Sequence, residues 1–306
     1  MKQIVAPSSF ADHETARRYI AQCEGSFRRR VIELADEFSA IRGLRLIGLS
    51  GPTCAGKTTT ASLLVGHLEG LGHRVHVISV DDFFHEQPHD KRAMNADQTI
   101  DFDSIEALDF ELFADSLDSL MSTGRASIPR FDLSTGCRMG YRELISTDES
   151  DIFLVEGIQV VYPEISALLR RYTYRCIFSN VSTALSVGGV VYSPEQIRLL
   201  RRIVRDYYFR SSDAAFTYYL WDSVRANEEN NIFPNAASCD VQLDSLMGYE
   251  IGMLRPHLEI ILGNLPLSNA HRADADAVFN HISGVQPLHP SWLPSDALYR
   301  EFVPLG

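Results

Sequence analysis

Two kinds of hydrophobic pattern alternate along this chain, and together they predict its main elements. Short, nearly continuous apolar runs predict strands buried on both faces, and they lie at 44–50, 74–80, 152–157 and 173–178. Apolar residues recur every three or four positions, as in helices, at about 57–70, 104–121, 195–210, 213–230 and 247–262. Buried strands alternating with helices predict an α/β fold with a parallel sheet flanked by helices.

The N-terminal segment shows a third pattern. Within residues 11–42, apolar residues such as Ile20, Phe27 and Val31 are spaced by threes, fours and one seven, which predicts one or two amphipathic helices that pack on the core. We therefore expect a helical segment over residues 1–43, followed by one domain over 44–306.

Three other segments complete the expected organisation. A short strand at 127–132 and the turn after it predict a hairpin with 137–144. The polar stretch 85–103 is too long for a simple connector, so it is a candidate substrate loop. The tail 285–302 is expected to be extended and to wrap over the domain.

Composition narrows the classes of protein that fit. The 306 residues are 45% hydrophobic and 22% charged, and no apolar run is long enough for a membrane-spanning helix. The first twenty residues lack the apolar segment of a secretory signal. The five cysteines are odd in number, scattered and without a C-x-x-C pair, which favours a reducing cytoplasm and predicts no zinc site.

The net charge of −12 argues against nucleic acid as a partner, because that binding depends on neutralising phosphates. An acidic protein that handles a phosphorylated ligand must instead concentrate positive charge locally. The chain offers two places for such a concentration, a glycine-rich loop and an arginine-rich helix.

The glycine-rich loop is 51-GPTCAGKTTT-60, which reads G-x-x-x-x-G-K-T between a predicted strand and a predicted helix. Gly51 and Gly56 let the backbone turn tightly toward phosphate oxygens, and the following helix directs its positive end at the same anion. Lys57 can reach the outer phosphates, and the Thr58 hydroxyl can ligate Mg²⁺. The residues expected to contact the nucleotide are Gly51, Thr53, Cys54, Ala55, Gly56, Lys57, Thr58 and Thr59. Cys54 is interpreted as a tolerated position in this motif, with a redox role as the alternative.

Acidic residues end two of the predicted strands. The carboxyl ends of parallel strands border the ligand crevice of such a sheet, so Asp81 and Glu156 are expected to face the nucleotide. Glu156 suits Mg²⁺ coordination, directly or through water. Asp81 suits a catalytic base that accepts a proton from a substrate hydroxyl. Asp82 is as well explained by capping a turn.

The arginine-rich helix is 195-EQIRLLRRIVRDYYFR-210. Its stacked guanidinium groups come from Arg198, Arg201 or Arg202, and Arg205. We expect this helix to close over the nucleotide as a lid and to stabilise charge during phosphoryl transfer. Arg205, as a catalytic group, and Arg210, as a nucleotide ligand, are the preferred contacts. The alternative is a solvated face paired with neighbouring carboxylates.

Taken together, these motifs resemble the uridine kinase and phosphoribulokinase family of P-loop kinases. The resemblance covers roughly residues 44–215, and the ordered segments that carry it are GPTCAGKTT, 80-VDDFF-84, 101-DFDSIEALD-109, 129-PRFDLSTGCR-138, 153-FLVEGI-158 and 201-RRIVRDYYFR-210. The later segments 221–245 and 298-LYREF-302 are similar to a bacterial uridine-kinase-like branch. Relatives of this kind form oligomers, so a homo-oligomer is a further option.

The resemblance also implies roles for individual residues. Asp81 looks like the catalytic base, Glu156 like the magnesium-associated carboxylate, Asp103 like the carboxylate that holds ribose hydroxyls, Arg138 like a substrate-side arginine, and Phe84 and Phe131 like aromatic residues near the base. Without the family, both phenylalanines are better explained as core residues. Uridine kinases have a base-recognising histidine where this chain has Gly136.

The function expected from the sequence is phosphoryl transfer, dependent on ATP and Mg²⁺, to a small hydroxyl acceptor. The preferred acceptor is the 5′-OH of a pyrimidine nucleoside such as uridine or cytidine. One alternative is a kinase for another metabolite, such as a sugar phosphate, because Gly136 departs from the family pattern and because His85, His89, Lys91 and Arg92 could receive an anion. Another is a nucleotide-dependent switch without transfer activity, which Asp103 and Arg138 argue against.

Overall fold

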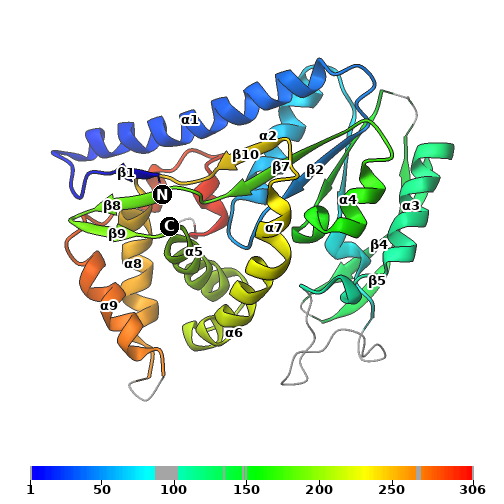
Figure 1. Ribbon diagram of the computed structural model, residues 1–306. Coiled ribbons are helices and arrows are strands. Elements are labelled where there is room, and N and C mark those ends of the chain that lie inside the picture. The colour runs from blue at the N-terminus through cyan, green and yellow to red at the C-terminus, as the bar shows by residue number, and fades with distance from the viewer. Residues whose placement is uncertain are drawn as a thin grey trace.

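The protein is seen in a computed structural model that describes residues 2–86, 103–133, 135–146, 148, 150–266 and 270–304. Figure 1 shows the long helix α1 lying across one side of a central sheet, with the β4–β5 hairpin and α3 at one end of the molecule. The strands are β1 Gln3–Val5, β2 Leu46–Ser50, β3 Val75–Ser79, β4 Arg125–Asp132, β5 Cys137–Ile145, β6 Ile152–Glu156, β7 Tyr174–Asn180, β8 Ala184–Val187, β9 Val190–Tyr192 and β10 Val241–Asp244. The helices are α1 His13–Ser39, α2 Lys57–Gly70, α3 Phe110–Thr123, α4 Pro163–Leu169, α5 Pro194–Phe209, α6 Ala214–Asn227, α7 Phe233–Ala236, α8 Glu250–Gly263 and α9 Arg272–Ile282.

The central sheet has five parallel strands in the order β10-β7-β2-β6-β3. The predicted parallel sheet is therefore confirmed, and its fifth strand, β10, was not predicted. Because β6 lies between β2 and β3, the last residue of β6, Glu156, is paired in register with Leu49 on one side and Ser79 on the other. The carboxyl ends of these three strands therefore meet at one edge of the sheet.

Successive side chains of each strand point to opposite faces of the sheet, and they fill two cores, one on each face. Ile47 and Leu49 of β2 join a cluster that contains side chains of α1, α2, α5 and α8. Leu46 of the same strand, with Phe153 and Val155 of β6, joins a second cluster that contains α3, α4 and the hairpin. A strand with both faces covered must be apolar at successive positions, which explains the continuous runs in the sequence.

The N-terminal helix is a single element of 27 residues that begins at an Asp12 cap, whose carboxylate accepts from the Thr15 amide at 2.7 Å. The apolar residues predicted to face the core are fully or almost fully buried there. One polar residue is buried among them: Glu24 is 3% exposed, accepts from the Tyr249 hydroxyl, and accepts from the Leu298 amide at 3.0 Å. This helix thus contacts both α8 and the C-terminal tail.

Some boundaries and pairings differ from the expectations. The predicted helix over 104–121 is divided, because a 3₁₀ turn at Ile105–Ala107 comes first and Asp109 caps a new start by accepting from the Leu112 amide at 3.1 Å. The predicted hairpin is confirmed as the antiparallel pair β4–β5. Cys176 and Cys239, 63 residues apart, form a disulfide that their spacing did not indicate. Within the described part of the chain, no helix is long and apolar enough to cross a membrane.

Candidate active site at the β2–α2 junction

The glycine-rich loop connects β2 directly to α2, as the motif requires. Lys57 is the first residue of α2, and its Nζ donates to the carbonyls of Gly51 at 2.8 Å and Pro52 at 2.9 Å. The side chain therefore lies back over the loop. Burial lowers the pKa of Lys57, and the carboxylates of Glu156, Glu301 and Asp81 counter that effect. An anion that binds at the loop could therefore pair with the Lys57 ammonium.

A side chain at either of two glycines would collide with a neighbouring residue. Gly51 has φ +150°, and a Cβ there would lie 1.9 Å from the carbonyl oxygen of Ser179 on β7. Gly56 has φ +79°, and its Cβ would lie 2.7 Å from Leu298 Cδ1. Cys54, between them, also has a positive φ of 57°, which is uncommon for a residue with a side chain and is often found at functional sites.

Asp81 and Glu156 lie at the carboxyl ends of neighbouring strands, as the sequence predicts. Asp81 lies in a 3₁₀ turn, Val80–Phe83, immediately after β3, and Glu156 ends the neighbouring strand β6. Burial, together with the negative charge of Glu156, raises the pKa of Asp81 to about 6, and Lys57 opposes the rise. Asp103 and Arg210 also act on Asp81 electrostatically. The structure thus brings together Lys57, Asp81 and Glu156, which the sequence had separated by up to a hundred residues.

Asp82 faces away from this group. Its Oδ1 accepts from the Phe131 amide at 3.3 Å, and its Oδ2 lies 3.8 Å from Arg142 of β5. Burial raises the pKa of this carboxyl as well, with the Phe131 amide opposing. Asp82 therefore fixes the hairpin against β3, which agrees with its alternative interpretation as a structural residue.

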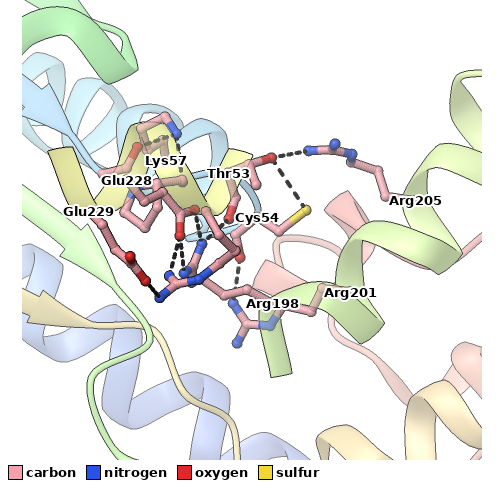
Figure 2. A network of polar contacts seen from close by, with 11 residues as sticks. Thr53, Cys54, Lys57, Arg198, Arg201, Arg205, Glu228 and Glu229 are labelled. Carbon is pink, nitrogen blue, oxygen red and sulfur yellow. Dashed lines mark hydrogen bonds and ion pairs between the residues drawn. The ribbon is translucent and has the colours of Figure 1, made fainter. Parts of the chain in front are cut away.

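Figure 2 shows that Arg198, Arg201 and Arg205 of the arginine-rich helix α5 reach the glycine loop at Thr53 and Cys54. Arg198 is 1% exposed and is held by both carboxylate oxygens of Glu228, while its guanidinium donates to the Thr53 carbonyl at 3.4 Å. Glu228 begins a π-helical turn, Glu228–Ile232, that continues α6. A second arginine, Arg225, pairs with the same carboxylate.

Arg201 makes the equivalent contact one turn later. It is fully buried, binds Glu250 of α8 through two of its nitrogens, and donates to the Cys54 carbonyl at 3.0 Å. The expectation that this helix closes over the nucleotide as a lid is wrong for Arg198 and Arg201. The charged face is buried because each guanidinium meets a carboxylate from a different helix and a carbonyl of the loop.

Arg205 lies further along the same helix, and Arg210 follows its last residue. Arg205 donates to the Thr53 hydroxyl at 3.4 Å and to Asp206 at 2.7 Å, and it is 8% exposed. Arg210 is exposed and lies 3.8 Å from Asp206. Their expected roles as a catalytic group and a nucleotide ligand stay predictions, and of the two Arg205 contacts the loop.

The residues expected on the acceptor side lie around the hairpin. Arg138 of β5 donates to the Phe84 carbonyl at 3.2 Å and to Asp109 at 3.4 Å. Phe84 is 2% exposed, and its ring centroid is 5.6 Å from that of Phe131, which is partly buried. Phe84 therefore packs in the second core, and contact of either ring with an acceptor stays a prediction. Gly136 lies in the hairpin turn, with φ 66°.

Tyr162 was not singled out from the sequence. It precedes α4, and its hydroxyl lies 2.7 Å from the Asp103 carbonyl and 3.0 Å from Asn227 Oδ1. Asp103 is thereby held between α4 and α6, and its expected role toward ribose hydroxyls stays a prediction. Of the candidate substrate loop, residues 87–102, which include His89, Lys91 and Arg92, lie outside the described residues.

The donor set fits a magnesium ion bound mainly through a nucleotide. Thr58, an exposed residue at the start of α2, and Glu156, at the end of β6, could supply two oxygen ligands. In the described ranges, no group of three or more histidine, cysteine or acidic side chains could hold a metal. Mg²⁺ often uses one or two protein oxygens and takes the rest of its ligands from phosphates and water, so this small set is adequate.

A buried strand, a glycine loop, a helix that begins with lysine, and carboxylates at adjacent strand ends together define a P-loop protein of the α/β class. The chain belongs to the Phosphoribulokinase / Uridine kinase family of P-loop kinases, whose family model matches residues 46–251, more than half of the chain.

Curated relatives support this membership. A protein named uridine kinase from Halobacterium salinarum is 26% identical over 200 residues, which are 64% of this chain and 77% of the relative. One of the same name from Schizosaccharomyces pombe is 30% identical over 174 residues, 56% of this chain but only 34% of that longer protein. The solved structure of the protein YGR205w matches 69% of this chain and 89% of its own, with TM-score 0.52 and 14% identity, which shows the fold alone.

Proposed function

We propose that this protein is a kinase that transfers the γ-phosphoryl group of ATP to a hydroxyl of a small acceptor. The proposal rests on the position of three side chains. Lys57 begins α2, and Asp81 lies in the turn that follows β3. Glu156 ends β6, the strand that pairs with both β2 and β3. A loose phosphoryl transition state needs mainly positioning and electrostatic stabilisation, and these residues supply both.

Each residue then has one task. Lys57 leaves its loop carbonyls and pairs with the outer phosphates, while Arg205 balances charge that develops during transfer. Asp81 accepts the proton of the attacking hydroxyl, which it can do at neutral pH because its pKa is about 6. Thr58 and Glu156 would hold Mg²⁺, which when bound would neutralise phosphate charge. The buried arginines 198 and 201 hold the loop in position without touching the nucleotide.

The preferred acceptor is the 5′-OH of a pyrimidine nucleoside, because the two curated relatives described above are named uridine kinases. Asp103 would hold the ribose hydroxyls, with Arg138, Phe84 and Phe131 on the acceptor side. A sugar phosphate is the alternative, and Gly136 favours it because a missing hydrogen bond to a base edge removes a large part of the discrimination. A cytoplasmic location belongs to the same proposal, and a homo-oligomer stays an option that only the family resemblance suggests.

An acceptor panel distinguishes these options. Wild-type protein with Mg²⁺ and ATP is incubated with uridine, cytidine, other nucleosides and ribulose 5-phosphate, and the products are identified by mass spectrometry. We expect uridine or cytidine to gain one phosphate, and Lys57→Ala to give no product. Phosphorylation of the sugar phosphate alone would assign the alternative acceptor, whereas acceptor-independent hydrolysis of ATP would favour a nucleotide-dependent switch.

The raised pKa of Asp81 predicts the pH dependence of transfer. A base must be ionised, and a carboxyl with a pKa of about 6 loses its ionised form as the pH falls through that value. At one unit below the pKa, only about a tenth of the protein retains the carboxylate. We expect kcat/KM for the acceptor to fall about tenfold for each further unit of acidification. A flat profile down to about pH 5 would contradict Asp81 as the base.

A further inference from the structure

The C-terminal tail forms part of the nucleotide loop's surroundings, although it lies beyond the residues matched by the family model. Its last turn, Leu298–Glu301, is a 3₁₀ turn whose first residue packs directly on Gly56. A Cβ added to Gly56 would lie only 2.7 Å from Cδ1 of Leu298. The turn thus lies against the point where the loop becomes α2.

This turn is anchored by buried groups on two helices. The Leu298 amide donates to Glu24 of α1 at 3.0 Å, and the hydroxyl of the fully buried Tyr299 donates to Glu250 of α8. Glu250 in turn holds Arg201, which donates to the Cys54 carbonyl. The turn and the loop therefore share one network, and the position of the turn is fixed relative to the phosphate site.

Glu301 projects from this fixed turn toward α2. Its Oε2 accepts from the Thr59 hydroxyl at 3.2 Å, two residues after Lys57, and the side chain is partly exposed. Its negative charge acts on both Lys57 and Arg205. A carboxylate beside a phosphate-binding loop repels the phosphates of a ligand, so phosphate binding does not explain it.

A carboxylate accepts hydrogen bonds, and it has acceptor capacity beyond the single bond to Thr59. The hydrogen-bond donors that ATP offers are its two ribose hydroxyls and the exocyclic amine of its base. We propose that Glu301 recognises the nucleoside part of the donor nucleotide by accepting hydrogen bonds from these groups. The inference rests on the proposed function only in taking a nucleotide as the ligand of the loop.

The test measures equilibrium binding by calorimetry, with no acceptor and no transfer. Wild type, Glu301→Gln and Thr59→Val are titrated with Mg²⁺–ATP and with Mg²⁺–tripolyphosphate, which carries the phosphates alone. Further arms use 2′-deoxy-ATP, 3′-deoxy-ATP and purine riboside triphosphate, each of which lacks one candidate donor and adds none. Asp296→Asn is the matched control, because it removes a negative charge from the same tail at an exposed pair with Arg28.

We expect Glu301→Gln to weaken ATP about tenfold while tripolyphosphate binds as well as before or more tightly, because a charged acceptor is lost and a repulsion is removed. One of the three analogues should bind wild type more weakly than ATP does, and Glu301→Gln should not weaken its binding further. The group that this analogue lacks is then the group that Glu301 contacts. Asp296→Asn should leave both ligands unchanged.

Two results would overturn the inference. If Glu301→Gln shifts ATP and tripolyphosphate equally, and Thr59→Val reproduces that shift, Glu301 only anchors the start of α2. If ATP binds more tightly to Glu301→Gln, the carboxylate opposes the nucleotide. Because binding alone is measured, a wild type that binds ATP and transfers nothing would contradict the proposed function and leave this inference standing.

Discussion

Replacing Asp81 with Asn is expected to lower the rate of phosphoryl transfer by about 10²–10⁴-fold, the usual contribution of a positioned general base. ATP binding should persist, because Lys57 and the glycine loop do not depend on this carboxylate for their position. The folded state should be no less stable, because burial and the charge of Glu156 already oppose ionisation of Asp81. Single-turnover transfer, ATP titration and thermal unfolding measure the three quantities separately.

Asp82→Asn is the matched control, one residue along the chain. Asn can still accept from the Phe131 amide, and burial raises the pKa of Asp82 as well, so stability should change by no more than about 1 kcal/mol while transfer is largely kept. Equal losses of transfer in the two variants would mean that the position of the hairpin, and not a base at residue 81, limits the reaction. Full activity of Asp81→Asn would remove the assigned base.

Replacing Glu250 with Gln is expected to cost about 3–5 kcal/mol in the free energy of unfolding, because it leaves the fully buried Arg201 without its counter-charge. Glu250 also accepts from the Met247 amide at 2.6 Å and from Tyr299, so one substitution disturbs the loop, α8 and the C-terminal turn together. Denaturant unfolding measures the loss. Affinity for ATP should fall in parallel, because Arg201 holds the Cys54 carbonyl.

Glu259→Gln, on the same helix, provides the comparison. Its pair with Arg255 is partly exposed and i,i+4, so its removal should change stability by no more than about 0.5 kcal/mol. A similar small effect for Glu250→Gln would show that the buried pair contributes little, and that the loop is held by its backbone and by Ser179, whose hydroxyl donates to the Ala55 carbonyl at 2.7 Å.

The parts of the site that follow from local sequence could be predicted. Gly51, Gly56 and Lys57 have defined spacing between a strand and a helix, and the structure places them there. Asp81 and Glu156 could be predicted because each ends an apolar run, and the ends of parallel strands meet at one edge. In each case the signal lies within about ten residues, so no knowledge of distant packing is needed.

The buried supports of the loop could not be predicted in the same way. Arg198 and Arg201 belong to a charged stripe along one helix. The sequence pattern of such a stripe is the same whether it forms a solvated face, a lid or a buried network. Only the partners decide, and Glu228 and Glu250 lie 30 and 49 residues further along the chain. Glu301 is still more remote, 242 residues from Thr59. The Cys176–Cys239 disulfide was hidden by separation as well.

The most direct test of the central claim follows the γ-phosphoryl group itself. Wild-type protein is mixed with Mg²⁺ and γ-labelled ATP in the presence of uridine or cytidine, and the label is traced by chromatography. We expect the label in a nucleoside monophosphate, in amounts equal to the ADP formed, and its absence with Lys57→Ala or Asp81→Asn. Label found only as inorganic phosphate, at a rate unaffected by any hydroxyl acceptor, would contradict the assignment of this site as a kinase.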